Sequence, residues 1–213
     1  MANVNAPGTT HRQRQALETR AQIVAAARRL FATRGYAGTT IQAIADESGV
    51  AVPTVYDAFR SKRGILEGAR LAMLAESEIP ALMSGAIAEP DPARKLGLAA
   101  KWVRQQMERS SDVIRAFRDG ARADPEVAAD HRRILDNRAR SLARFIDSLA
   151  DGLAPGVSRR EATDLLWAFS NEELYRELVE ERAWSPDRFE RWLAATLRQQ
   201  LLGARGKVQT DGS

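Results

Sequence analysis

The side chains best suited to chemistry in this sequence lie close together, between Thr39 and Lys62. Hydroxyl, phenol and ammonium groups in this segment can donate hydrogen bonds to phosphate oxygens, and a carboxylate can accept one from the amino group of a cytosine. Small apolar side chains beside them can lie against a groove wall. The candidate nucleic-acid contacts are Thr39, Thr40, Val52, Pro53, Thr54, Tyr56, Asp57 and Lys62.

Two short helices joined by a tight turn are predicted to position these side chains. Thr39 and Gln42 match a capping box, in which two side chains bond backbone N–H groups at a helix start, so the first helix should begin here. Gly49 is suited to end that helix because a positive φ costs glycine least. Pro53 suits the first turn of the next helix, where its missing N–H would have no partner. The pattern over about residues 39–60 is a helix-turn-helix.

The outward-facing side chains of the second helix are the expected readers of base sequence. Val55 and Phe59 are four residues apart and can face the core, which turns their neighbours outward. We expect Thr40 and Lys62 to bind phosphates, and Tyr56 to contact the backbone or a thymine methyl group. The side chains expected to face bases or the groove wall are Val52, Pro53, Thr54 and Asp57.

An ordinary helical hairpin is the alternative interpretation, because Ala45, Gly49 and Val55 could serve packing alone. The flanking sequence favours the helix-turn-helix. Residues 19–35 place apolar side chains on one face and arginines on the others, which predicts an amphipathic helix before it. Ser61 can cap a further helix directly after it.

The order of these motifs is specific. It comprises Gly35-Tyr36, Thr39-Thr40-Ile41, Ile44-Ala45, Gly49-Val50, Pro53-Thr54-Val55-Tyr56, Phe59 and Ser61-Lys62. From about Ala16 to Ser77, the sequence closely resembles the DNA-binding domain of TetR-family transcriptional regulators. The resemblance implies a DNA-binding domain over residues 16–77 and an effector-binding and dimerisation domain over residues 78–203. It also implies a homodimer that binds a palindromic operator in double-stranded DNA, most often as a repressor, and is released by a small-molecule effector.

The excess of positive charge lies at the N-terminal end of the chain. Residues 1–64 hold nine Lys and Arg against four Asp and Glu, whereas the rest of the chain is nearly neutral. Such a basic region suits a polyanion, because neutralised phosphates release their counterions. A membrane surface could use the same charge, but it would also need a broad exposed apolar helix face. The pattern therefore favours DNA and no membrane.

Both ends of the chain are predicted to be unstructured. Residues 1–15 form a polar arm that carries Arg12 and Arg14, and such an arm either stays disordered or reaches an adjacent minor groove. Residues 204–213 form a disordered tail. The absence of cysteine excludes disulfides and thiolate metal sites. No apolar run approaches the length of a membrane span and the first residues lack a signal-peptide core, so we expect a cytoplasmic protein.

The fold class predicted from the whole pattern is all-α, with about nine helices and three of them in the DNA-binding domain, because no alternation at period two persists. N-cap signals occur at Asp91-Pro92, Asp112, Asp124-Pro125 and Ser158. The remaining predicted helices lie near residues 92–109, 113–122, 125–150 and 158–182, with a last one from Ser185-Pro186.

The last two predicted helices carry broad apolar surfaces. The alternatives are that they bury against a second copy of the chain or only close their own domain, and periodicity does not separate these. In TetR-like proteins the last two helices of each subunit form a four-helix dimer interface, so the resemblance favours a homodimer. The corresponding interface candidates are Leu166, Phe169, Phe189, Trp192, Leu193, Thr196, Leu197 and Leu201.

Large side chains in the middle helices are candidates for an effector site, since apolar pockets with a few polar groups bind small molecules. The alternative is that they fill the core. The existence of a pocket is implied by the resemblance and not by the residues themselves. The candidates are Trp102, Arg104, Met107, Phe117, Trp167, Asn171 and Tyr175.

An enzyme is the competing functional class. The chain has only two histidines, His11 and His131, and no glycine-rich phosphate loop or HExxH motif. We therefore expect no catalysis, no cofactor and no bound metal. A third class is a ligand- or partner-binding protein of the same fold that does not bind an operator. Asp57 supports this class, because a carboxylate on the recognition helix repels phosphate unless it accepts from a cytosine.

Overall fold

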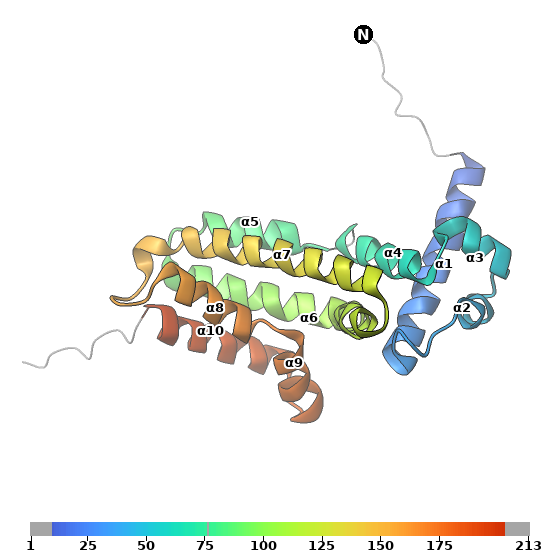
Figure 1. Ribbon diagram of the computed structural model, residues 1–213. Helices are drawn as coiled ribbons and strands as arrows, with labels where there is room; N and C mark the ends of the chain where they lie inside the picture. Colours follow the sequence, from blue (N-terminus) through green and yellow to red (C-terminus); the bar gives the residue numbers. More distant parts are fainter. Residues whose placement is uncertain (1–9, 76, 203–213) are drawn as a thin grey trace, which may run out of the picture. The chain divides into compact units, whose positions relative to one another are not determined.

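The computed structural model describes residues 10–75 and 77–202, and every regular element within them is helical (Figure 1). Ten α-helices are present in these residues, which confirms the predicted all-α class and is close to the predicted number. The chain divides into two compact units. The first contains Met1–Glu76 and Asp112–His131, and the second contains Ser77–Ser111 and Arg132–Ser213.

The first unit is built on four helices near the N-terminus. They are α1 (His11–Arg34), α2 (Ile41–Ser48), α3 (Val52–Phe59) and α4 (Lys62–Ala75). Helix α1 packs against α2 and α4, and α3 packs against α2 and α4. Their shared core includes the buried side chains of Ile23, Phe31, Ile44, Val55, Phe59 and Ile65. Burying these faces against one another holds the short helices in place, because an isolated helix of eight residues is marginal in water.

Helix α1 begins earlier than the sequence pattern predicts. Thr10 and Gln13 form a reciprocal capping box, in which the Gln13 N–H donates to the Thr10 hydroxyl and the Thr10 N–H donates to Gln13 Oε1 at 2.8 Å. The prediction of disorder for residues 1–15 is therefore wrong for residues 11–15, which form the first turns of the helix. Residues 1–9 and the predicted tail, 204–213, lie outside the described residues.

The second unit contains the remaining helices. They are α5 (Ile79–Ala88), most of α6 (Pro92–Ala123) and α7 (Pro125–Asp147), a short 3-10 turn (Ala150–Gly152), α8 (Arg159–Phe169), α9 (Glu172–Tyr175), a π-helical segment (Arg176–Glu181) and α10 (Pro186–Leu202). Buried Lys95 ties three of them together, because its ammonium on α6 donates to Ile87 O at the end of α5 and to Ser148 O after α7, both within 2.9 Å.

Two predicted helix boundaries are wrong. Helix α6 runs without a break through Asp112, whose carboxylate pairs with Arg28 at 2.6 Å and does not cap a new helix. The predicted helix over residues 158–182 is interrupted after Phe169, where the Asn171 side chain caps α9 by accepting from the Leu174 N–H at 2.7 Å. Both side chains are used in ways that the local sequence does not specify.

Among the described residues, no single helix is long and apolar enough to cross a membrane. Only α4 and α5 taken together would reach the required length and composition.

Candidate nucleic-acid interface

The turn between α2 and α3 has the geometry expected of a helix-turn-helix. Gly49 ends α2 in the left-handed region, with φ 69° and ψ 19°. The start of α2 differs from the prediction, because Thr40 is the N-cap and accepts from the Ala43 N–H at 3.1 Å. Thr39 is only 1% exposed, and its hydroxyl donates to Gly35 O at 2.8 Å. The predicted DNA contact by the Thr39 side chain is therefore wrong, because this side chain fixes the connection between α1 and α2.

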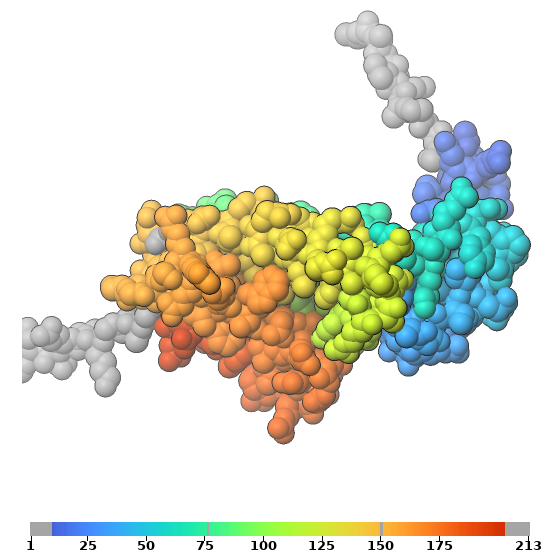
Figure 2. Space-filling view, viewed as in Figure 1, coloured from blue at the N-terminus to red at the C-terminus, as the bar shows by residue number. Residues whose placement is uncertain are grey.

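Helix α3 has a buried face and an exposed face, as predicted. Val55 and Phe59 are buried in the core of the first unit. The predicted reading residues Pro53, Thr54, Tyr56 and Asp57 are exposed, and Val52 is half-buried. Tyr56 is 48% exposed, which is unusual for a large aromatic side chain and leaves it available to a partner. Figure 2 shows this unit's helix-turn-helix at the molecular surface.

Lys62 was predicted to bind a phosphate, but its ammonium group is turned toward the protein. Its ammonium donates to Tyr36 O at 2.8 Å and to Thr39 O at 2.9 Å, and it lies 4.2 Å from the centre of the Tyr36 ring. Burial lowers the pKa of Lys62. Lys62 thus joins the α1–α2 connection to the first turn of α4. It holds the helix-turn-helix in position from inside the first unit.

Sequence reasoning missed a second cation, Arg20, that supports the recognition helix. Its guanidinium donates to Ala58 O and lies 4.1 Å from the centre of the Phe59 ring. It therefore anchors the end of α3 to α1. The next residue, Arg60, has a φ of 66°, a conformation that favours glycine, so the chain leaves α3 through a strained residue.

A groove of about 530 Å³ lies between the first turns of α1 and the exposed face of α3. Arg12 and Arg20 line its α1 side, and Thr54 and Asp57 line its α3 side. Because α1 begins at His11, Arg12 is held on a helix and not on an unstructured arm. The groove brings positive charge next to the reading residues, which suits a phosphate-bearing partner.

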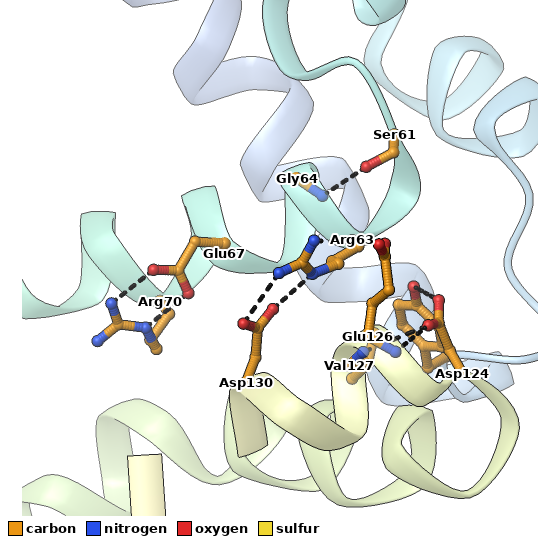
Figure 3. Close-up of polar contacts among 10 residues, drawn as sticks. Ser61, Arg63, Gly64, Glu67, Arg70, Asp124, Glu126, Val127 and Asp130 are labelled. Atoms are coloured by element: carbon orange, nitrogen blue, oxygen red, sulfur yellow. Dashed lines mark hydrogen bonds and ion pairs between the residues drawn. The ribbon is translucent and has the colours of Figure 1, made fainter. Parts of the chain in front are cut away.

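The start of α7 and the end of α6 also pack within the first unit (Figure 3). Arg63 on α4 donates to both oxygens of Asp130, at 2.6 and 3.0 Å, and to Glu126 at 3.3 Å. The hydrogen bond from Arg63 to Asp130 raises the pKa of Arg63. The Tyr36 hydroxyl donates to Asp124 at 3.3 Å, and burial followed by the Asp124 charge raises the pKa of Tyr36. These contacts join residues too far apart in sequence to be found from local patterns.

The predicted effector residues do not all come together. Trp102, Met107 and Tyr175 are buried in the second unit, where Trp167 is half-buried, but Phe117 belongs to the first unit. The two polar candidates have other partners: Arg104 pairs with Glu190 at 2.7 Å, and Asn171 caps α9. An unpredicted feature is that two buried polar atoms one turn apart on α6, Trp102 Nε1 and Gln105 Oε1, have no hydrogen-bond partner among the described residues.

Most of the predicted dimer-interface residues lie inside the subunit. Five of them are completely buried in a single chain, so they close their own domain, and the prediction that they contact a second copy is wrong. These are Leu166, Phe189, Leu193, Leu197 and Leu201. The other three, Phe169, Trp192 and Thr196, are half-buried. The physical reason is that α8 and α10 each use their apolar stripe to pack within the second unit.

Comparison with known proteins finds a family match within the first unit. Residues 23–69 match the family described as bacterial regulatory proteins, tetR family. The matched segment contains the whole helix-turn-helix. No curated protein matches the sequence.

Several solved structures share the fold over most of the chain. The TetR family transcriptional regulator PfmR from Thermus thermophilus is 22% identical with a TM-score of 0.65, covering 93% of this chain and 100% of PfmR. NalD from Pseudomonas aeruginosa, the secondary repressor of the MexAB-OprM multidrug efflux pump, is 21% identical with a TM-score of 0.67, covering 88% and 98%. FadR from Bacillus subtilis in complex with stearoyl-CoA is 18% identical with a TM-score of 0.65, covering 83% and 96%.

Proposed function

We propose that the protein is a ligand-responsive transcriptional regulator that binds a palindromic DNA operator as a cytoplasmic homodimer, represses transcription and is released by a small-molecule effector. The observation that carries this proposal is the exposed polar face of α3 in the TetR-type domain, held by the buried side chains of Val55 and Phe59. A helix exposed in this way can enter a major groove with its backbone fixed.

The contact residues in this proposal follow from exposure. Thr54 and Asp57 read base edges, and Tyr56 contacts the sugar-phosphate backbone or a thymine methyl group. Thr40 is exposed at the N-terminus of α2, where backbone N–H groups also favour an anion. Arg12, on the first turns of α1, takes the phosphate role that the sequence assigned to Lys62.

A homodimer is supported by the side chains that α8 and α10 leave exposed. Ala168 on α8 and Ala195 on α10 are exposed, and Leu165 and Leu202 are half-buried. Small exposed side chains allow two helix pairs to approach closely. Two-fold symmetry would then place the two α3 helices in successive major grooves, about 34–36 Å apart on one side of the duplex.

An effector site in the second unit is supported by the orphaned atoms of α6. Trp102 Nε1 is a donor and Gln105 Oε1 an acceptor, and a buried polar group without a partner is unfavourable until something bonds it. FadR was solved with stearoyl-CoA and NalD is described as a repressor. These relatives support a ligand-responsive repressor.

The alternative function is a ligand- or partner-binding protein of the same fold without operator binding. Exposed Asp57 is the observation that favours it, because a carboxylate on the reading face repels phosphates. Asp57→Asn separates the two functions. For a regulator, the variant should change the preferred base at one operator position; for a protein that does not bind an operator, it should create at most salt-sensitive, sequence-independent binding.

The deciding experiment is a gel shift with the full chain and DNA fragments that flank its own gene, at several salt concentrations. We expect retention of a specific fragment, with an affinity that falls steeply as salt rises. Thr54→Ala should alter sequence preference, whereas Arg12→Ala should weaken binding to all sequences alike. If no fragment is retained in preference to random DNA at any salt concentration, the alternative function replaces the proposal.

A further inference from the structure

A positively charged groove lies between α6 and α10 in the second unit, separate from the DNA-binding face. Its volume is about 670 Å³. Four cationic side chains line it, two from each helix, and in both helices the two cations are seven residues apart. They are Arg94 and Lys101 on α6, and Arg191 and Arg198 on α10. Seven residues are two helical turns, so each pair is on one face, with its Cα atoms about 10.5 Å apart.

The floor between the cations is formed by small or apolar side chains. Gly97, Leu98 and Ala194 lie between the charged positions of the two helices. This floor leaves room above it and provides few polar groups of its own. A ligand that lies along the groove can therefore be reached by all four cations.

The four cations of the groove outnumber its two acids, Glu89 and Glu190. Glu190 is paired with Arg104 at 2.7 Å, and Glu89 accepts the Asp91 N–H at 3.0 Å. Among the described residues, Arg94, Lys101 and Arg191 make no side-chain hydrogen bond or ion pair. Such an excess of positive charge favours an anionic ligand.

Arg198 is positioned in a way that depends on glycine. Its Nε–H donates to Ala93 O at 2.8 Å, so the guanidinium crosses the surface of α6. A Cβ atom at Gly97 would lie 2.8 Å from Arg198 Nη2, closer than real contacts allow. Glycine inside a helix is less favourable than alanine. Its presence at this position of α6 lets Arg198 lie across the helix, with Nη2 close to Gly97.

We propose that this groove binds a soluble small molecule with two or more phosphate groups. Arginine and lysine side chains bind phosphate through charge-assisted hydrogen bonds, and guanidinium groups can do so with two parallel bonds. The spacing of each cation pair matches an elongated polyphosphate better than a single phosphate. The site is independent of the DNA-binding function, so it stands or fails separately from that proposal.

The test is isothermal titration of the DNA-free full chain with sodium tripolyphosphate, at about 0.15 M salt, where distant surface charges are screened. Inorganic phosphate, adenosine triphosphate and coenzyme A are titrated in parallel. We expect saturable one-site binding of tripolyphosphate and at least tenfold weaker binding of inorganic phosphate. Tighter binding of a nucleotide than of tripolyphosphate would indicate a nucleotide-type ligand, and equal binding would indicate that the phosphates alone are recognised.

Two variants locate the site. The double variant Lys101→Gln and Arg191→Gln removes two cations and should weaken tripolyphosphate binding about tenfold or more. Its matched control, Arg132→Gln with Arg182→Gln, removes the same charge from exposed positions outside the groove and should change binding less than threefold. Gly97→Ala should displace Arg198 and weaken binding while the thermal midpoint stays the same or rises.

Either of two results would overturn the proposal. One is a wild-type protein that shows no saturable tripolyphosphate binding. The other is an equal loss of binding in the groove variant and in the control variant, since the attraction would then be a general effect of net charge. Operator binding is measured for each variant as a separate readout, and the groove substitutions should leave it unchanged in the absence of polyphosphate.

Discussion

The ammonium group of Lys62 holds two parts of the first unit together. It donates to the carbonyl oxygens of Tyr36 and Thr39. We expect Lys62→Ala to lower the free energy of unfolding by about 1–3 kcal/mol, because both acceptors lose a charged donor. Denaturant unfolding measures this loss. Arg34→Ala, which removes an exposed cation from the end of α1, is the control and should be nearly neutral.

The same variant distinguishes a positioning role from a phosphate contact. If Lys62 only positions the helix-turn-helix, the affinity of Lys62→Ala for DNA should fall. The slope of log affinity against log salt concentration should then stay the same. A slope reduced by about one, as expected for one lost phosphate contact, would show instead that Lys62 also reaches the DNA backbone.

His131 on α7 makes stability depend on pH. Burial, and after it the charge of Arg118, lower the pKa of His131. The unfolded chain keeps the ordinary pKa of about 6.5, so it takes up a proton at a higher pH than the folded chain. The stability that neutral His131 provides is present in full above the unfolded-state pKa of about 6.5. It is lost as the pH falls through the lower pKa of the folded chain. Thermal midpoints at pH 7.5 and 5.5 should therefore differ more in the wild type than in His131→Gln, and equal differences would contradict this.

At the scale of elements, two glycines of α4 determine how closely α3 approaches it. A Cβ atom at Gly64 would lie 2.1 Å from Phe59 O, and one at Gly68 would lie 2.5 Å from a ring atom of Phe59. The contact at Gly64 is with backbone, which cannot rotate away. We expect Gly64→Ala to destabilise the protein by at least about 1–3 kcal/mol, as overpacking does.

The matched control is a glycine in a helix with open space around it. Gly85 in α5 has no atom within 4 Å of a Cβ position. Gly85→Ala should therefore be neutral or stabilising by up to about 1 kcal/mol, since alanine favours the helix. Thermal unfolding of both variants tests the prediction, and a stabilising Gly64→Ala would show that α3 does not pack against α4 in this way.

Local chemistry was sufficient to predict many elements but not their long-range partners. Ser158 caps α8 and Asp124 caps α7, because each side chain bonds an N–H two or three residues away. The exposed face of α3 also followed from the spacing of Val55 and Phe59. Asp112 and Lys62 were assigned wrongly because their partners, Arg28 and the two carbonyls, are 84 and 23 to 26 residues away.

Burial was the other quantity that periodicity could not supply. The apolar stripe of α10 was visible in the sequence, but a stripe looks the same whether its partner is the same chain or a second copy. Leu193 and Leu197 prove to be 0% exposed in one chain. The effector residues were assigned from size and position alone, so Phe117 was grouped with side chains of the other unit.

For the whole molecule, the proposed homodimer depends on small exposed side chains. Ala168→Glu with Ala195→Glu should halve the mass measured by light scattering and weaken operator binding, because charged groups would be buried between the copies. Leu197→Ala is the contrasting variant and should instead destabilise each subunit by about 2–5 kcal/mol. An unchanged mass in the double variant would place the interface elsewhere on the chain.

The aromatic cluster around α10 has an optical consequence. Trp184 and Trp192 meet edge to face with ring centres 5.9 Å apart, and Phe169 lies against Trp192 at 6.3 Å. Two indoles at this distance and in a fixed mutual orientation should couple their electronic transitions, giving a near-ultraviolet circular dichroism signal that vanishes when the packing loosens. Trp192 is on the same helix as Ala195, so this signal should also respond to the proposed contact between copies, and no dye needs to be attached.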